Sequence, residues 1–470
     1  MYCVLNGHGF QYELQTISQI FYPNEKFVLV GAPPDDGRTV CSSYSGGSVV
    51  SRVYSGGVLA AIDERRPATD NGVELRRTVR SGMYGALKKA TGYACPWGEL
   101  TGMKPTKLIT ELLEKKYTEP EIYRHMRSEY DVNDAKTRLC FEAARRGMKL
   151  TDGGRAASLY IGVPFCATRC LYCSFTSYEI TRFDAGAYLG ALSKEIMAVR
   201  PFFDKNKIDA IYVGGGTPTA LSENDFQTLL NLITENFDTA GAREFTVEAG
   251  RPDTLSREKL RAMKTCGVTR ISVNPQTADD GTLNLIGRGH TASDVAESFE
   301  LARAEGFTNI NADLIMGLPG ETERHARVTM EFVRRLAPEG VTVHTLAIKR
   351  ASRFKEEFYS HGLPDRDETE RMLGVARERC GEMGLAPYYM YRQKNSTGNF
   401  ENVGYCADGH ECVYNVQIIA EKQTIVALGA GGVTKVYYRP ENRIERVFNV
   451  KDPGIYISRI DEMIERKKIL

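Results

Sequence analysis

The stretch 158-SLYIGVPFCATRCLYCSF-175 joins a short apolar run to three cysteines, Cys166, Cys170 and Cys173. The apolar run is rich in branched residues, which is typical of a β-strand that is buried on both faces. The cysteines have the spacing Cys-x3-Cys-x2-Cys, and no fourth cysteine stands nearby. Because structural zinc is almost always four-coordinate, the triplet predicts a metal site in which something other than cysteine fills the remaining position.

A pattern of short strand, polar or glycine-rich loop and amphipathic helix recurs from this stretch onwards. The predicted strands are 158–164, 209–215, 244–249, 270–274, 310–316 and 341–348. The helix starts fit a capping pattern, as in Ser222 with Asp225 and Thr291 with Asp294. Six β-α units predict a parallel sheet that curls into a barrel or partial barrel. Chemistry in such barrels sits at the C-terminal ends of the strands, where the three cysteines lie.

The fold class that we predict is α/β, with a partial (β/α)6 TIM-like barrel over residues 155–350. Residues 1–150 form a separate N-terminal α+β domain, in which a strand-like run at 47–62 precedes several helices. The helical runs lie at about 73–90, 105–116 and 131–146. Residues 351–470 form a C-terminal α+β extension that covers the substrate. Its strand-like runs lie at 412–428 and 443–450, followed by a final helix.

The composition is that of an ordinary globular protein, with 42% hydrophobic and 26% charged residues among 470. A formal net charge of +1 predicts no strong attraction to nucleic acid or to an acidic membrane surface. We find no signal-peptide pattern and no stretch with the roughly 18 apolar residues of a membrane span. Eleven cysteines without export indicate reduced thiols, so we expect a cytoplasmic protein, most simply a monomer.

The cysteine triplet has three explanations. A zinc site lacks a ligand, and three plain buried cysteines would be unusual in one exposed loop. A [4Fe–4S] cluster fits better, because three thiolates can hold three irons and leave the fourth iron open to another ligand. A second group, Cys406, His410 and Cys412, matches no standard zinc spacing, so free thiols are favoured there over metal ligands.

The triplet resembles the motif of radical S-adenosylmethionine (SAM) enzymes, Cys-x3-Cys-x-aromatic-Cys, with Tyr172 in the aromatic position. Further blocks resemble the oxygen-independent coproporphyrinogen III dehydrogenase (oxidase) family within these enzymes. They are GGGTPT (214–219), VEAGRPD (247–253), SVNPQT (272–277), IGRGHT (286–291) and NADLIMGLPGET (311–322). The flanks 96–108, 391–405 and 428–435 resemble the longer HemZ-type branch of that family.

The resemblance implies the cofactors and their contacts. A [4Fe–4S] cluster on the three cysteines would bind the amino and carboxylate groups of SAM. An electron from a donor such as a flavodoxin or ferredoxin would then release a 5′-deoxyadenosyl radical. One or two SAM molecules would contact the residues that match family positions, which are Tyr160, Gly215, Gly216, Thr217, Glu248, Gln276, Arg288, Asp313 and Ala347.

Several of these residues also have ordinary structural interpretations. Tyr160 lies within a strand and could simply pack in the core. The loop at 214–218 could be a tight turn between strand and helix. Arg288 could pair with a neighbouring acid. The sequence leaves these alternatives open.

The resemblance also implies a tetrapyrrole substrate. The family converts two propionates of coproporphyrinogen III to vinyls by oxidative decarboxylation, giving protoporphyrinogen IX for haem biosynthesis. Cations at the barrel mouth would bind the propionates, and the candidates are Lys349, Arg350, Arg353 and Arg392, although a charged helix cap would read the same. Ser174 and Phe175 stand where well-studied members have a fourth, non-ligand cysteine.

Two other functions share this barrel. Haem chaperones of the family have an HNxxYW-like stretch, whereas residues 402–415 contain no Trp, the single Trp being Trp97. This difference disfavours a chaperone without excluding one through His410. The third possibility is anaerobic haem cleavage with SAM as the methyl donor.

Overall fold

The computed structural model describes residues 1–470 except 24, 70, 103, 152–155, 348–361 and 394–396. The chain forms two compact units, Met1–Phe141 and Glu142–Leu470. The described residues from 362 to 470 therefore belong to the same unit as the predicted barrel. Within the described part of the chain, no helix is both long and apolar enough to cross a membrane.

The first unit is built on a five-stranded sheet in the order β2-β1-β3-β4-β5. Its strands are β1 (Tyr2–Asn6), β2 (Val28–Leu29), β3 (Arg38–Ser45), β4 (Ser48–Ser55) and β5 (Val58–Arg65). Its helices are α1 (Gln11–Phe21), α2 (Gly72–Thr91), α3 (Pro105–Glu114) and α4 (Glu119–Tyr130), and the division between the units falls within α5 (Asp134–Met148). Helix α2 lies directly on the sheet, since a Cβ at Gly85 would stand 2.6 Å from a carboxylate oxygen of Asp63.

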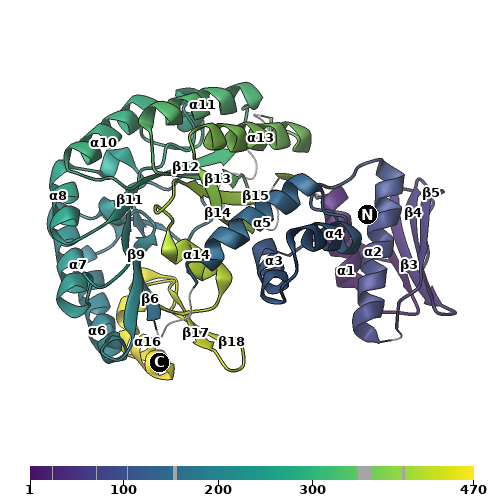
Figure 1. The fold of residues 1–470 in the computed structure, drawn as a ribbon, viewed down its shortest axis with the longest axis horizontal. Coiled ribbons are helices and arrows are strands. Elements are labelled where there is room, and N and C mark those ends of the chain that lie inside the picture. The colour runs from purple at the N-terminus through teal and green to yellow at the C-terminus, as the bar shows by residue number, and fades with distance from the viewer. Residues whose placement is uncertain (24, 70, 103, 152–155, 348–361, 394–396) are drawn as a thin grey trace. The chain divides into compact units, whose positions relative to one another are not determined.

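The second unit contains the partial (β/α)6 barrel. Its six parallel strands are β6 (Ala156–Val163), β9 (Lys207–Gly215), β10 (Glu244–Glu248), β11 (Arg270–Ser272), β12 (Ile310–Met316) and β13 (Gly340–Thr345). Every one of them coincides with a predicted strand, so the predicted fold class is confirmed. The helices that follow the strands are α6 (Ala185–Phe203), α7 (Glu223–Asn236), α8 (Arg257–Thr265), α9 (Asp280–Leu285), α10 (Ala292–Ala304) and α11 (Glu323–Leu336). Most of them form a curved outer layer around the strands (Figure 1).

The outer helices begin where the sequence predicts. The Asp225 amide donates to Ser222 Oγ at the start of α7, and Thr291 and Asp294 form a capping box at the start of α10. Each cap satisfies backbone N–H groups that would otherwise lack a partner. The apolar stripe of α7 is fully buried against the strands, as Phe226 and Leu229 show. These helices hold the strands so that their carboxyl ends meet at one edge of the sheet.

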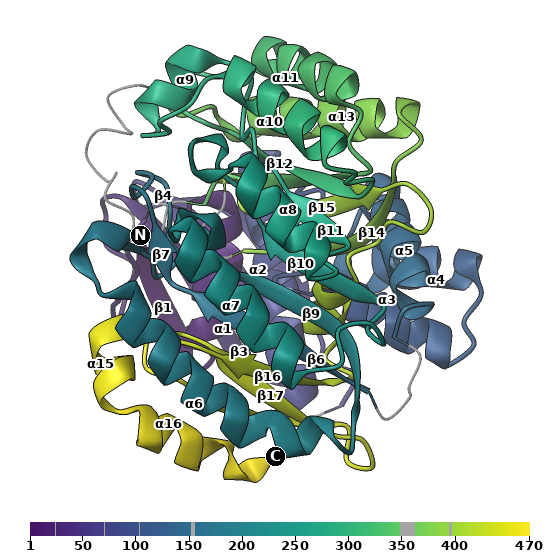
Figure 2. The same ribbon diagram turned by 90° about the vertical axis from the view of Figure 1, so that its left-hand side faces the viewer.

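The C-terminal residues lengthen the barrel sheet at both of its ends. On one side β15 (Glu401–Cys406) pairs antiparallel with β13, and β14 (Ala386–Arg392) pairs with β15. On the other side β16 (Thr424–Leu428) pairs parallel with β6, and β17 (Val433–Tyr438) and β18 (Arg443–Phe448) follow it. Helices α13 (Arg366–Glu382), α15 (Pro453–Ser458) and α16 (Ile460–Arg466) join the outer layer, where α15 and α16 run beside α6 (Figure 2).

The strand predicted at 412–428 is wrong in its first half. Residues Val413–Ala420 form the helix α14, and only Thr424–Leu428 form a strand. A continuous apolar run does not distinguish a buried strand from a buried helix. Here the run fills the interior of the barrel, where the ring of Tyr414 stacks on the ring of Tyr212 with centroids 4.5 Å apart.

Candidate cofactor site

The three cysteines lie in a loop at the carboxyl end of β6. Short strands β7 (Phe165–Cys166) and β8 (Tyr178–Glu179) pair at the base of this loop. The Cys173 amide donates to the Cys170 carbonyl at 3.1 Å, and the Leu171 amide donates to the Ile286 carbonyl at 3.0 Å. The cysteine loop, residues 166–173, is therefore tied to the IGRGHT block, although the two are far apart in the sequence.

Each of the three cysteine sulfurs has a hydrogen-bond donor nearby. Thr217 Oγ1 donates to Cys166 Sγ at 3.5 Å, and a guanidinium nitrogen of Arg251 lies 3.9 Å from Cys170 Sγ. Burial raises the pKa of the Cys166 and Cys173 thiols, while the Thr217 hydroxyl and the Phe175 amide act in the opposite direction. The donors offset part of the effect of burial and act toward the thiolate, the form in which cysteine binds iron.

The described residues hold no group of three His, Cys, Asp or Glu side chains that is gathered around a single ion. Three thiolates in one loop can hold three irons of a [4Fe–4S] cluster, because each thiolate binds a different iron.

The glycine-rich turn after β9 packs against the cysteine loop. The Gly216 amide donates to the Val163 carbonyl at 2.8 Å, and Gly215 has a φ of 113°. A Cβ at Gly216 would stand 2.4 Å from the Phe165 carbonyl oxygen, and one at Gly214 would stand 2.8 Å from the Glu248 carboxyl carbon. Packing within the protein therefore requires these glycines, which supports the tight-turn interpretation.

Glu248 ends β10 beside this turn. Its carboxylate accepts hydrogen bonds from the Tyr212 hydroxyl at 2.6 Å and from the Gly215 amide at 3.2 Å. Burial raises the pKa of Glu248 to about 7, although the two hydrogen bonds act in the opposite direction. A carboxylate held in this way at the barrel mouth is suited to accept hydrogen bonds from hydroxyl groups.

Gln276 and Asp313 lie together after β11 and on β12. Gln276 has a φ of 68°, and its amide donates to the Asp313 carbonyl at 2.9 Å. Gln276 is 7% exposed, and its Oε1 is buried with no hydrogen-bond partner among the described residues. Burial raises the pKa of Asp313, but His344 and Asn311 outweigh it and hold that pKa below its ordinary value. An unsatisfied buried acceptor beside a carboxylate fits a polar ligand such as SAM.

Of the remaining predicted SAM contacts, Tyr160 and Arg288 have structural partners of their own. The Tyr160 ring stacks on Tyr414, with centroids 5.7 Å apart, so its packing interpretation is supported. Its hydroxyl also lies beside Gly215. Arg288 is 8% exposed and donates to the Asn274 carbonyl at 3.3 Å. Ala347 follows β13 and is half-buried.

The predicted propionate-binding cations are only partly described. Lys349, Arg350 and Arg353 lie outside the described residues. Arg392 ends β14, is 5% exposed, and donates two hydrogen bonds to the Asn399 carbonyl at 3.0 and 2.8 Å. The guanidinium of Arg392 therefore holds its own chain segment.

Cys406, His410 and Cys412 lie at the opposite end of the barrel sheet. Cys406 pairs with Gly340, the first residue of β13, whereas the cysteine loop follows the last residue of β6. The Cys412 thiol donates to a Glu244 carboxylate oxygen at 3.2 Å, and His410 makes a turn through the Ala407 carbonyl. These contacts agree with the interpretation of the two cysteines as free thiols.

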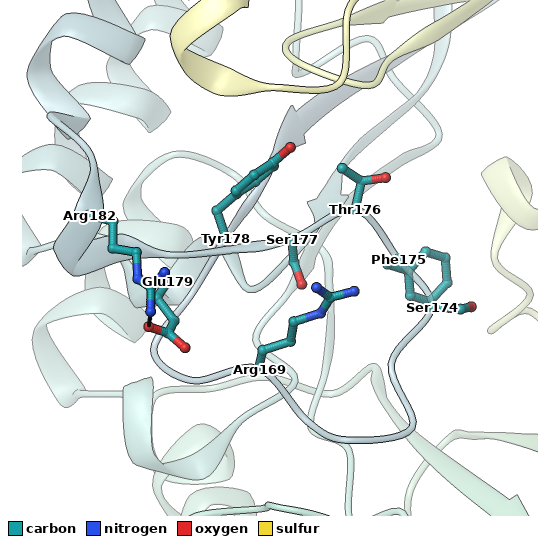
Figure 3. Close-up of a pocket in the computed structure, with 8 residues that line it drawn as sticks. All are labelled: Arg169, Ser174, Phe175, Thr176, Ser177, Tyr178, Glu179 and Arg182. Carbon is teal, nitrogen blue, oxygen red and sulfur yellow. Dashed lines mark ion pairs between the residues drawn. The ribbon is translucent and has the colours of Figure 1, made fainter. Parts of the chain in front are cut away.

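A cavity of about 290 Å³ opens beside the cysteine loop. It is lined by Arg169, Ser174, Phe175, Thr176, Ser177, Tyr178, Glu179 and Arg182. Arg169 points toward Ser177, while the ion pair of Glu179 with Arg182 stands at the far side (Figure 3). Phe175 is 68% exposed, so the segment that replaces the expected fourth cysteine faces the surface.

Arg251 is a site residue that the sequence motifs did not indicate. It belongs to the VEAGRPD block after β10, and it contacts the cysteine loop at Thr168 and Cys170. Its presence in a block at a strand end was the available signal. The sequence alone did not show that its side chain reaches the loop.

The comparisons with known proteins agree with this geometry. A model of the radical SAM superfamily matches residues 160–333. The "Oxygen-independent coproporphyrinogen-III oxidase-like protein HemZ" of Bacillus subtilis is 37% identical over 403 residues, covering 84% of this chain and 80% of that protein. The chain therefore belongs to the radical SAM superfamily and, within it, to the family of oxygen-independent coproporphyrinogen III oxidase-like proteins that includes HemZ.

Two further known proteins are similar to this chain. The "Heme chaperone HemW" of Bacillus subtilis is 36% identical over 49% of this chain and 62% of that protein. The solved structure of coproporphyrinogen III oxidase (HemN) from Escherichia coli has a TM-score of 0.54 and 23% identity, covering 67% of this chain and 72% of that chain. The latter similarity shows the radical SAM fold. As a member of this superfamily, the protein uses a [4Fe–4S] cluster and SAM.

Proposed function

We propose that the protein carries out the oxygen-independent oxidative decarboxylation of two propionates of coproporphyrinogen III, giving protoporphyrinogen IX. The observation that carries this proposal is the similarity to the HemZ protein across 84% of the chain, together with the polar groups at the carboxyl ends of the barrel strands. The same similarity supports the expectation that the substrate is a tetrapyrrole.

The residues have distinct parts in this proposal. Cys166, Cys170 and Cys173 hold the cluster. The Glu248 carboxylate accepts hydrogen bonds from the ribose hydroxyls of SAM, and Gln276 Oε1 gains the partner that it lacks in the protein. When bound, the cluster and SAM supply a radical that abstracts hydrogen atoms.

The remaining contacts position SAM and keep water out. Gly215, Gly216 and Thr217 present their backbone to SAM, while Arg288, Asp313 and Ala347 complete its surroundings. The stacked rings of Tyr160, Tyr212 and Tyr414 close the barrel below Glu248. A dry, fixed site keeps the reacting carbon next to the radical.

The same bonds change in each of the two propionates. A hydrogen atom leaves the β-carbon of the side chain, the bond to the carboxylate breaks, carbon dioxide departs and a vinyl group forms. The remaining electron passes to a one-electron acceptor. Lys349, Arg350 and Arg353 follow β13 in the sequence and bind the propionates in this proposal. The electron that starts the reaction comes from a donor such as a flavodoxin or ferredoxin.

Chaperone activity is the second candidate, because the HemW protein of Bacillus subtilis is 36% identical over 49% of this chain. His410 is the residue on which the sequence-based case for haem binding rested. It lies at the amino end of the strands, away from the cysteine loop, which favours the enzymatic function.

One experiment separates these functions. The protein is reconstituted anaerobically with iron and sulfide and incubated with SAM, a reductant and either coproporphyrinogen III or haem. Protoporphyrinogen IX supports the proposal. 5′-Deoxyadenosine with intact tetrapyrrole and tight haem binding indicates the chaperone, and an open-chain tetrapyrrole indicates haem cleavage. Failure to bind a cluster contradicts the cysteine assignment itself.

A further inference from the structure

Arg251 links the turn after β10 to the cysteine loop through a charged side chain. One guanidinium nitrogen donates to the Thr168 carbonyl at 3.1 Å and to the Thr168 hydroxyl at 2.8 Å. The same nitrogen lies 3.9 Å from Cys170 Sγ. One charged group therefore contacts the backbone of the cysteine loop, a side chain of that loop and the sulfur of Cys170.

The geometry of Arg251 is fixed from the other side by Asp253. Arg251 Nε donates to one carboxylate oxygen at 2.9 Å and Nη2 donates to the other at 2.7 Å. This two-bond pairing orients the planar guanidinium, so that Nη1 is directed to the cysteine loop. The carboxylate also offsets part of the positive charge.

The charge of Arg251 is shielded from water. The whole residue is 2% exposed, whereas the side chain of Asp253 is 28% exposed. A guanidinium stays protonated at any physiological pH. Because its surroundings are poorly screened, its charge acts on Cys170 more strongly than a surface arginine would.

We propose that Arg251 is a positioning residue that orders the cysteine loop for cluster assembly and raises the reduction potential of the bound cluster. The reduction potential of an iron–sulfur cluster depends on nearby charge and on hydrogen bonds to its sulfurs. Reduction adds one negative charge, which a buried cation next to Cys170 stabilises. Asp253 has the opposite electrostatic effect while it orients Arg251. This inference rests on the assignment of the three cysteines to the cluster, and it is independent of the tetrapyrrole.

The test measures iron content and the midpoint potential of the anaerobically reconstituted full-length protein, without tetrapyrrole. Arg251→Gln should lower the iron bound per chain. It should also lower the ratio of reduced to oxidised cluster at a fixed potential about tenfold, a shift of about 59 mV for one electron. Arg251→Lys should have a midpoint potential between those of Arg251→Gln and the parent protein, because it keeps the positive charge but loses the planar pair of N–H donors that bind Asp253. Arg261→Gln, which removes an exposed arginine on α8, is the matched control and should match the parent protein.

Asp253→Asn gives a prediction of opposite sign. It keeps the guanidinium charge and one acceptor for it and removes a compensating negative charge, so the midpoint potential should rise. This variant also tests the proposal if Arg251→Gln does not fold. Unchanged potentials in both variants, or shifts of the same sign, would overturn the role of Arg251. A parent protein that binds no cluster would instead overturn the cysteine assignment, so the two failures are distinguishable.

Discussion

The two ends of the barrel sheet both contain buried cysteines and charged residues, but the sulfurs have opposite surroundings. At the carboxyl end, Cys166 faces a hydroxyl donor and Cys170 faces a guanidinium. At the amino end, the Cys412 thiol donates to the carboxylate of Glu244. Donors stabilise a thiolate, whereas a carboxylate acceptor requires the protonated thiol.

The difference also extends to the local backbone. Cys412 is completely buried at the start of α14, and Glu244 also accepts a hydrogen bond from the Val413 amide at 2.7 Å. Cys166 and Cys173 are only partly buried, and most of the cysteine loop lacks regular secondary structure. The same residue type therefore closes the barrel at one end and is available for ligation at the other. The amino-acid type alone therefore does not distinguish a structural cysteine from a cysteine that is available as a ligand.

The largest expected effect is on cluster binding. Cys173→Ala should reduce bound iron and visible absorbance after reconstitution to below about a tenth of the parent value, because one iron of the cluster loses its thiolate. Cys412→Ala should retain the cluster and lose about 1–3 kcal/mol of stability, since Glu244 loses a buried donor. Iron analysis measures cluster binding, and thermal unfolding measures stability, in both variants. Full iron in Cys173→Ala, or its loss in Cys412→Ala, would invalidate the contrast between the two ends.

A smaller effect is expected on SAM affinity. Glu248→Gln should weaken SAM binding to the cluster-loaded protein by about tenfold to a hundredfold, because hydrogen bonds to a charged group contribute roughly 1.5–3 kcal/mol. Isothermal titration calorimetry measures the change. Glu297→Gln on the exposed side of α10 is the control. Equal affinities in the two variants would show that Glu248 does not contact SAM.

A substitution in the glycine-rich turn after β9 should have a smaller effect, which is on stability. Gly216→Ala places a Cβ against the Phe165 carbonyl and should cost about 1–3 kcal/mol, with partial loss of iron, because the base of the cysteine loop has to move. Gly190→Ala on α6 meets open space and should be neutral or stabilising by up to about 1 kcal/mol. Chemical denaturation compares the two. A neutral Gly216→Ala would mean that the turn adapts without strain.

The smallest effect is the pH dependence of the cofactor-free protein. Burial raises the pKa of Glu248 from 4.5 to about 7, so folding favours its protonated form. The corresponding stability is complete below pH 4.5 and is lost as the pH rises through about 7. Glu321, whose pKa burial also raises to about 7, adds a parallel contribution. The melting temperature should therefore fall over this range, and less steeply in Glu248→Gln. Identical slopes would contradict the assignment to Glu248.

Much of the barrel could be predicted because its signals are local. Each strand is a short apolar run, and the caps at Ser222 and Thr291 stand within three residues of their partners. The strands β14 and β15 and the helix α14 could not be assigned correctly, because their conformations depend on pairing and packing with distant parts of the chain.

The candidate site also has a part that is encoded locally and a part that depends on distant segments of the chain. The spacing of Cys166, Cys170 and Cys173 is a local pattern, so the sequence was sufficient to find it. The contact of Arg251 with Thr168 joins two different loops, and nothing in either loop encodes it alone. The tyrosine stack beneath Glu248 likewise brings together Tyr160, Tyr212 and Tyr414 from three separate elements.

The pairing of β16 with β6 has a consequence for the order of events during synthesis. The cysteine loop leaves the ribosome long before β16, yet β6, which leads into this loop, has β16 as its neighbour on one side. Until that neighbour emerges, β6 is an uncovered parallel edge, and such edges are prone to incorrect pairing. Stable iron insertion is therefore expected after translation of the C-terminal strands, when the barrel sheet has both of its flanks.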